Sequence, residues 1–235
     1  HIKLFSKTDR RDYKDMNQYV TNLNYLSHSP KFGKLEEYAK KNEIPIIQYE
    51  ALVLLLAIIK MKHIKKILEI GTAIGYSSLQ MASMSKTIDI DTIERDEKMK
   101  DLALENIKSF SLENQIHVHF SDALSIDLSQ LQSDYDLIFI DAAKSQYEKF
   151  FHRFSPLLKH DGIIVTDNIL FHGCVETMLE NDKNLTKNVR NMAKKIDKYN
   201  QFLSNHEIFE TFYLNLGDGP VSYTHLRAHE TRSNL

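Results

Sequence analysis

Short apolar runs alternate with longer segments of mixed polarity through the middle of this chain. The runs have the length and composition of buried strands, and they cover residues 66–70, 88–93, 116–120, 135–140 and 162–166. The intervening segments have helical patterns, and they cover residues 77–84, 97–110, 123–131 and 146–158. Strands that alternate with helices at this pitch predict βαβ units and a parallel sheet, which makes this an α/β chain.

The two flanks of the alternating region carry different patterns. Upstream, helices are predicted at residues 12–26, 34–41 and 48–62, with Ser29-Pro30 as a break. Downstream, a long polar helix is predicted at 185–203, and strands at 206–214 and 220–222. Residues 223–235 show neither pattern, which favours a non-native or disordered tail. We therefore expect a single domain over residues 1–222, with an N-terminal helical cap at about 12–62.

Composition narrows the classes of protein that remain. A chain of 235 residues suits one large α/β domain. Its formal net charge of -2 provides no overall basic field, so nucleic-acid binding would need a local patch. The single cysteine, Cys174, excludes an intramolecular disulfide. The longest apolar run, residues 51–59, falls short of the ~20 residues that cross a bilayer. No secretory leader pattern begins the sequence, and we expect a cytoplasmic protein without a membrane partner.

Oxygen-bearing side chains follow two of the predicted strands. Asp141 comes directly after the run that ends at Ile140, and Asp167-Asn168 follows Val165-Thr166. The carboxyl ends of parallel strands open into the ligand crevice of such a sheet, so these side chains are expected to converge. Carboxylate and amide oxygens suit Mg²⁺, Mn²⁺ or Ca²⁺ better than zinc. From these residues alone, Asp167-Asn168 could equally be an ordinary turn.

A glycine turn after the first predicted strand indicates a nucleoside cofactor. Gly71 and Gly75 stand where the chain must turn tightly and approach a ligand. Ala73 and Tyr76 replace the later glycines of the dinucleotide fingerprint, which disfavours a pyrophosphate cradle. Glu94 ends the second strand, where a carboxylate can accept both ribose hydroxyls, although it could also be a solvated strand end.

Several motifs in order resemble the metal-dependent S-adenosylmethionine O-methyltransferases, a family that includes the catechol and caffeoyl-CoA enzymes. The motifs are ILEIGTAIGYSS, DTIERDEKM, SDAL, YDLIFIDAAKSQYEKFF and GIIVTDNILFHG. Within that family, IPI, KKIDKYNQFLSNH and NLGDGPVS are most similar to the bacterial tRNA 5-hydroxyuridine methyltransferases. The resemblance implies a Rossmann-like class I methyltransferase fold, with a mostly parallel seven-stranded sheet, helices on both faces and extra N-terminal helices. It also implies S-adenosyl-L-methionine as the methyl donor, a divalent ion such as Mg²⁺, and a homodimer.

The same resemblance assigns roles to individual residues. The implied cofactor-binding residues are Ile47, Glu69, Gly71, Ser77, Glu94, Ala123 and Asp141. The implied metal ligands are Asp141, Asp167 and Asn168. Lys144, three residues past Asp141, is the candidate general base and shares the catalytic role with Asp141, although it could also be a solvated residue that opens the next helix.

The methyl acceptor stays open between two chelating groups. A 5-hydroxyuracil ring presents its hydroxyl beside a carbonyl, and a catechol presents two hydroxyls. A basic stripe on the long helix favours the anticodon loop of tRNA, although such a stripe is commonly a solvated helix face. The stripe consists of Lys187, Arg190, Lys194 and Lys198, with Lys183 just before it. The hypotheses are methylation of tRNA 5-hydroxyuridine to 5-methoxyuridine, methylation of a small catechol-like acceptor, and cofactor binding without catalysis.

Overall fold

The computed structural model describes residues 23, 30–171, 173–179 and 185–214, together with the backbone of residues 221–226. The chain divides into two compact units, His1–Ile44 and Pro45–Leu235. The first unit contains helix α2 (Pro30–Lys41). Pro30 is the first residue of this helix and not a break before it, because a proline at the first position loses no helical hydrogen bond. The helix expected at 12–26 falls almost entirely outside the described residues.

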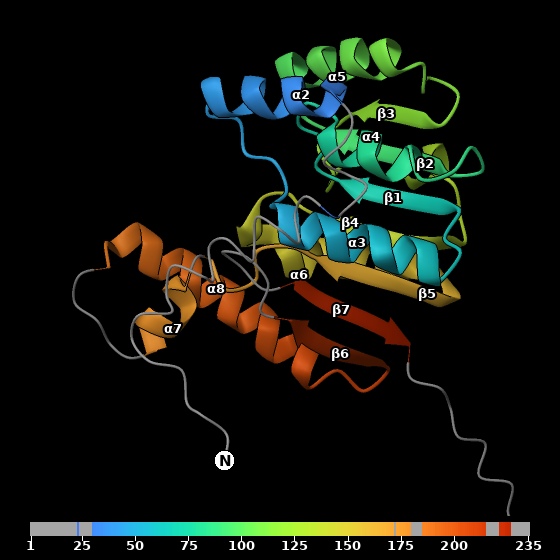
Figure 1. Ribbon diagram of the computed structural model, residues 1–235. Coiled ribbons are helices and arrows are strands. Elements are labelled where there is room, and N and C mark those ends of the chain that lie inside the picture. Colours follow the sequence, from blue (N-terminus) through green and yellow to red (C-terminus); the bar gives the residue numbers. More distant parts are fainter. Residues whose placement is uncertain (1–22, 24–29, 172, 180–184, 215–220, 227–235) are drawn as a thin grey trace, which may run out of the picture. The chain divides into compact units, whose positions relative to one another are not determined.

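A seven-stranded sheet organises the second unit (Figure 1). Its strands are β1 (Lys66–Ile70), β2 (Asp89–Glu94), β3 (Ile116–Phe120), β4 (Tyr135–Ile140), β5 (Leu158–Thr166), β6 (Phe209–Leu214) and β7 (Val221–Leu226). The strand order is β3-β2-β1-β4-β5-β7-β6, and the first five strands of that order pair in parallel. Strand β7 is antiparallel to both β5 and β6. It continues to Leu226, so the sheet extends four residues beyond the boundary at residue 222 that the sequence predicts.

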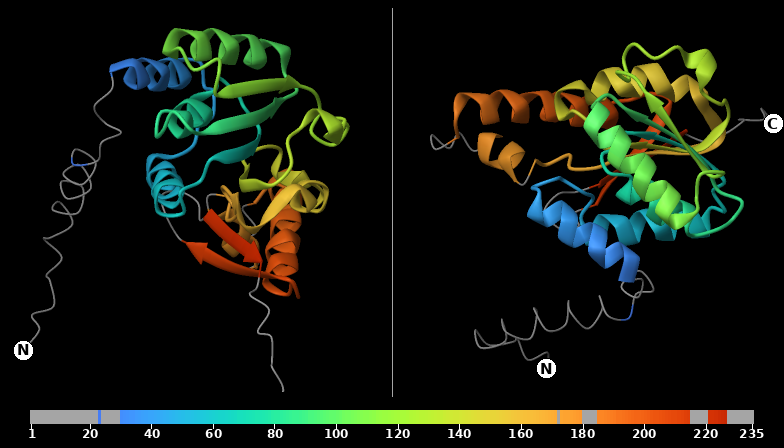
Figure 2. Two further views of the ribbon diagram at one scale, coloured as in Figure 1. Left: turned by 90° about the vertical axis from the view of Figure 1, so that its right-hand side faces the viewer. Right: turned by 90° about the horizontal axis from the view of Figure 1, so that it is seen from above.

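Helices cover both faces of this sheet. They are α3 (Tyr49–Met61), α4 (Tyr76–Ala82), α5 (Glu97–Phe110), α6 (Tyr147–Phe154), α7 (Cys174–Leu179) and α8 (Lys187–Ser204), with short 3₁₀ turns η3 (Leu128–Gln130), η4 (Lys144–Gln146) and η5 (Ser155–Leu157). Helices α3 and α4 lie on one side, and α6 and α8 on the other (Figure 2). Right-handed crossovers put the two groups of helices on opposite faces, because the strand order runs outward in opposite directions from β1 and from β4. In the described part of the chain, no helix is long and apolar enough to cross a membrane.

The helix predicted at 123–131 is wrong, because only the short turn η3 forms there. Two aspartates explain the difference. The Asp122 carboxylate accepts a hydrogen bond from the Leu124 backbone N–H, and Asp127 accepts one from Ser129. Such local bonds offer the backbone an alternative to helical bonding, and they favour turns over helix.

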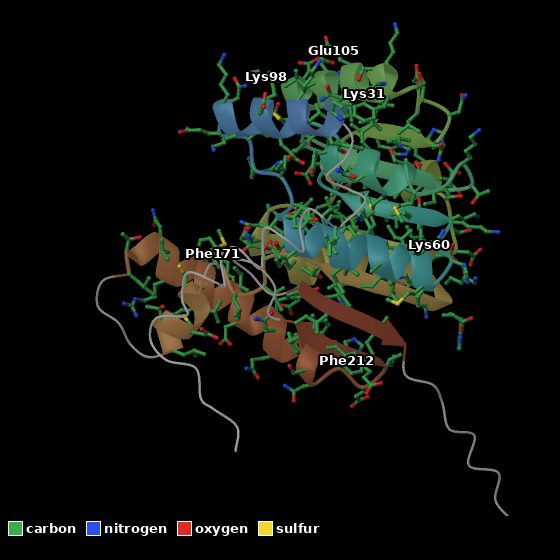
Figure 3. All side chains as sticks on the ribbon, viewed as in Figure 1. Lys31, Lys60, Lys98, Glu105, Phe171 and Phe212 are labelled. Carbon is green, nitrogen blue, oxygen red and sulfur yellow. The ribbon has the colours of Figure 1, made fainter. Side chains whose placement is uncertain are left out.

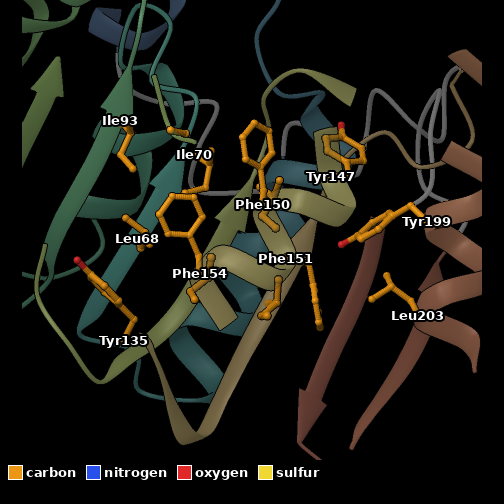
Figure 4. Close-up of a cluster of buried hydrophobic side chains, with 14 of the residues drawn as sticks. Leu68, Ile70, Ile93, Tyr135, Tyr147, Phe150, Phe151, Phe154, Tyr199 and Leu203 are labelled. Atoms are coloured by element: carbon orange, nitrogen blue, oxygen red, sulfur yellow. The ribbon is translucent and has the colours of Figure 1, made fainter. Parts of the chain in front are cut away.

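The core beneath the candidate site is built by one face of α6 (Figure 4). Tyr147, Phe150, Phe151 and Phe154 recur at helical spacing, and all four are buried. They join one cluster with strand residues such as Leu68 and with residues of α8. Each fully buried side chain of this size contributes about 1.5–3 kcal/mol, so this face holds α6, and the turn η4 before it, firmly against the sheet.

Candidate active site

The site lies where the strand order reverses, at the carboxyl ends of β1, β4 and β5. Asp141 follows β4, and its backbone N–H donates to the Ile70 carbonyl at the end of β1 (3.0 Å). Asp167 follows β5, and its N–H donates in the same way to the Ile140 carbonyl of β4 (3.1 Å). The ladder of the sheet therefore continues one residue past each strand and holds both aspartates side by side. A topological switch point of this kind is the usual ligand crevice of open α/β sheets.

A cavity of about 450 Å³ opens at this edge. Nearly all the residues that the sequence singles out line it, namely Ile47, Gly71, Ser77, Glu94, Ala123, Asp141, Lys144, Asp167 and Asn168. These residues come from segments that are far apart in the sequence, and the fold brings them to one cavity. Glu69 is the exception, because it is fully buried and does not line the cavity.

Two carboxylates and one amide form the acidic end of this cavity. Burial and the nearby Asp167 charge raise the pKa of Asp141, while the Lys144 ammonium partly offsets the increase. Burial likewise raises the pKa of Asp167, against a hydrogen bond that its carboxylate accepts from the Asn168 N–H (2.8 Å). Asn168 has a φ of 59°, which its short polar side chain tolerates better than most others. Its Oδ1 atom is buried and has no hydrogen-bond partner among the residues that the structure describes.

These observations fit a divalent cation. A buried oxygen without a hydrogen-bond partner destabilises the folded state, and so do two carboxylates that repel each other. A cation beside them would relieve both effects. Hard oxygen donors are the ligands that Mg²⁺ prefers. Among the described residues, no group of three or more His, Cys, Asp or Glu side chains is placed to hold a metal ion. The predicted metal ligands include two acidic residues, Asp141 and Asp167, and the third ligand is the amide oxygen of Asn168. The set therefore falls outside that description.

The glycine loop after β1 is tied to the end of β2 by Glu94. The Glu94 carboxylate accepts hydrogen bonds from the backbone N–H groups of Ala73 (2.8 Å), Arg95 (2.9 Å) and Asp96 (2.8 Å). A carboxylate has about four acceptor positions, so these bonds leave capacity for a ligand hydroxyl. Glu94 therefore positions the loop, besides lining the cavity.

Glu69 lies in the interior, next to the cavity wall. Ser77 donates to its carboxylate (2.5 Å), as does Thr92 (2.6 Å), and Ser78 provides a third hydrogen bond. Thr92 stands opposite Glu69 in the pairing of β1 with β2. Among these residues Ser77 lines the cavity, so Glu69 acts on the site through Ser77. Burial raises the pKa of Glu69 to about 7, against these three hydrogen bonds.

The buried Glu69 predicts a pH dependence of stability. A carboxyl whose pKa is raised by folding stabilises the folded state fully at low pH, and this contribution is lost as the pH rises through the folded pKa of about 7. We expect the free energy of unfolding to fall by about 3 kcal/mol from this source between about pH 4 and pH 8. Glu69→Gln should remove that decrease, as measured by urea unfolding across the pH range. Glu105→Gln, at an exposed position on α5 (Figure 3), is the control and should leave the decrease in place. An unchanged slope in Glu69→Gln would refute the assignment.

Sequence reasoning missed two residues that shape the site. Tyr147 is buried, and its hydroxyl donates to the Asp167 carbonyl (2.9 Å), which fixes the chain beside the acidic pair. Phe150, one turn further along α6, lines the cavity. Their helical spacing marks a core face, and only the fold shows that this face also reaches the site.

The sheet is Rossmann-like, with a glycine loop and an acidic strand end at its switch point. These features define the class of proteins that bind a nucleoside-containing cofactor. Comparison with known proteins is more specific. The family model described as O-methyltransferase matches residues 25–224. Caffeoyl-CoA O-methyltransferase of Populus kitakamiensis is 29% identical over 80% of this chain and 79% of its own length. Catechol O-methyltransferase of Niastella koreensis is 36% identical over 47% of this chain and 52% of its own.

A solved structure agrees with these relatives. A Staphylococcus aureus protein, provisionally named a caffeoyl-CoA O-methyltransferase, is 41% identical, with a TM-score of 0.81 over 88% of this chain and 98% of its own. The chain therefore belongs to the O-methyltransferase family. It is an S-adenosylmethionine-dependent O-methyltransferase, and its named relatives include caffeoyl-CoA and catechol enzymes.

Proposed function

We propose that this enzyme methylates the 5-hydroxyl of 5-hydroxyuridine in the anticodon loop of tRNA, with the help of a divalent metal ion. The observation that carries the metal part is the set of Asp141, Asp167 and the partnerless Asn168 oxygen at the wall of the cavity. The tRNA part rests on the sequence resemblance to the bacterial tRNA group. An anticodon-loop base is unpaired, so its entry into a cavity costs little.

The methyl donor and the acceptor would share the cavity. Ile47, Gly71, Ser77, Glu94 and Ala123 line the part that we assign to S-adenosylmethionine. Asp141, Asp167 and Asn168 would hold Mg²⁺ or a similar ion. When bound, such an ion lowers the pKa of a ligated hydroxyl as a Lewis acid. The cavity walls contribute by aligning the acceptor oxygen with the methyl group, an effect that can supply several kcal/mol.

Lys144 is the proposed general base. It lines the cavity at the first residue of η4, three residues after Asp141. In its neutral form it would take the proton of the acceptor hydroxyl, while the oxygen bonds to the methyl carbon. The carbon–sulfur bond breaks, and the sulfonium becomes a neutral thioether. The sulfonium thus loses its positive charge, and Lys144 becomes positively charged because it has taken up the proton.

Nucleoside mass spectrometry of tRNA from a deletion strain tests the acceptor. We expect 5-methoxyuridine to disappear and 5-hydroxyuridine to accumulate, because the last methylation step is missing. A plasmid with the wild-type gene should restore 5-methoxyuridine, and a Lys144→Ala gene should not. Unchanged 5-methoxyuridine in the deletion strain would exclude tRNA as the acceptor.

A small catechol-like acceptor is the second candidate, because the named relatives are caffeoyl-CoA and catechol enzymes. The same donor set could chelate two adjacent hydroxyls. Methylation of catechols by the purified protein, without methylation of tRNA, would favour this candidate.

Membership of the O-methyltransferase family gives no support to the hypothesis of a non-catalytic cofactor-binding protein. A homodimer and a cytoplasmic location remain proposals that rest on the sequence.

A further inference from the structure

A second hollow, of about 370 Å³, opens beside the active-site cavity. Its walls come from η4, α6 and α8, and it shares Lys144 and Gln146 with the active-site cavity. The two hollows are therefore neighbours across the short turn η4. We call the second one the basic hollow, because its lining includes Lys144, Lys149, His152, Lys195 and Lys198.

The charge of the basic hollow is almost entirely of one sign. Among the described residues that line it, one side chain is acidic, Glu148, and it is paired with the Lys198 ammonium (2.9 Å). Lys149 and Lys195 are exposed, and within the described residues neither forms an ion pair. A concave surface lined by one sign of charge concentrates counter-ions, so this surface should attract an anion.

The lysines of the basic hollow come together only through tertiary structure. Of the stripe that the sequence predicts on α8, only Lys198 lines the hollow. Lys195, which lies outside that stripe, joins it there, and Lys149 approaches from α6. Since α6 and α8 pack together, their basic side chains face one concavity instead of running along one helix.

We infer that the basic hollow binds backbone phosphate of the RNA whose base enters the active-site cavity. This inference rests on the proposed function. Lys144 borders both hollows, so a ligand that reaches from one to the other can place its reactive ring in the active-site cavity and a phosphate in the basic hollow. A nucleotide within a polynucleotide has this arrangement. Lysine ammonium groups bind phosphate as point charges, without base specificity, and so position the RNA while the cavity selects the base.

Paired charge-removing variants test the inference. The double variant Lys149→Gln/Lys195→Gln removes two charges from the basic hollow and none of the proposed catalytic groups. Lys60→Gln/Lys62→Gln removes two charges at the end of α3, near the amino ends of the strands, as Lys60 in Figure 3 illustrates. The full-length proteins are compared for binding and methylation of tRNA that carries 5-hydroxyuridine, and for methylation of 3,4-dihydroxybenzoate and of caffeoyl-CoA.

The hollow variant should bind this tRNA about 10-fold or more weakly at low salt. The slope of log Kd against log salt should decrease by about 1.4–1.8, as expected for two lost phosphate contacts. The rate with 3,4-dihydroxybenzoate, which has no phosphate, should stay unchanged in both variants. The control should retain wild-type tRNA binding and salt dependence.

Equal tRNA binding by the wild type and the hollow variant would overturn the inference, as would equal losses in both double variants. A hollow variant that loses activity only toward caffeoyl-CoA would assign the hollow to a phosphorylated small acceptor and overturn the RNA assignment. Failure of the proposed function looks different, because the wild-type protein itself would then methylate 3,4-dihydroxybenzoate but no tRNA.

Discussion

Replacing Asp141 with asparagine should reduce methyl transfer by more than about 100-fold, or about 2.7 kcal/mol in transition-state stabilisation. The exchange keeps the size of the side chain and removes one of the two carboxylates that we propose as ligands of a divalent ion. The measurement is kcat with the identified acceptor at saturating Mg²⁺. Chelation of divalent ions should reduce the wild-type rate in the same way.

Thermal unfolding separates this loss from a loss of structure. Without divalent ions, Asp141→Asn should be at least as stable as the wild type, because it removes one of two buried carboxylates that repel each other. Mg²⁺ at about 100 times its Kd should stabilise the wild type by about 2.7 kcal/mol and leave the variant nearly unchanged. Asp161→Asn, at an exposed aspartate of β5, is the matched control and should behave like the wild type. Full activity of Asp141→Asn would exclude metal assistance through this residue.

Gly71→Ala should cost at least about 3 kcal/mol of stability and abolish cofactor binding. Gly71 has a φ of 103°, and an added Cβ would lie 2.2 Å from the Asp141 carbonyl oxygen. Backbone strain accounts for about 1–3 kcal/mol of the expected cost. The collision adds to it, because the atom that would have to move is backbone at the end of β4, where the site is built. Denaturant unfolding gives the stability, and calorimetric titration with S-adenosylmethionine gives the affinity.

Gly173→Ala separates the two contributions. Gly173 also has a positive φ, of 77°, but a Cβ there would have no atom of the described residues within 4 Å. We expect this variant to lose only about 1–2 kcal/mol, from strain alone. Equal destabilisation by the two substitutions would show that the contact with Asp141 is unimportant.

The strands at the site could be predicted closely because the sequence marks them locally. Each is a short run that is mostly apolar, and β1, β3 and β4 have the predicted limits. Prediction was poorer where polar side chains compete with the helical backbone. The aspartates around η3 form local turns, so the apolar residues nearby do not make a helix.

The sequence predicts which residues belong to the candidate site, but not how their side chains are arranged. Asp141 and Asp167 are recognisable because each ends an apolar strand, and they line one cavity, as expected. Glu69 is recognisable as a polar residue inside a strand, yet its side chain bonds to Ser77, Ser78 and Thr92 instead of lining the cavity. Which neighbour a buried carboxylate meets depends on the pairing of β1 with β2, and that pairing joins distant segments.

By itself, the sequence determined the alternation of strands and helices, the acidic strand ends and the glycine loop, because periodicity and turn chemistry act over a few residues. Tertiary structure decided which of these features meet. It placed Asp141 beside Gly71, directed Tyr147 to the Asp167 carbonyl and brought lysines of α6 and α8 around one hollow. The physical reason is that strand order and helix packing depend on burial of surfaces from the whole chain, which no local pattern contains.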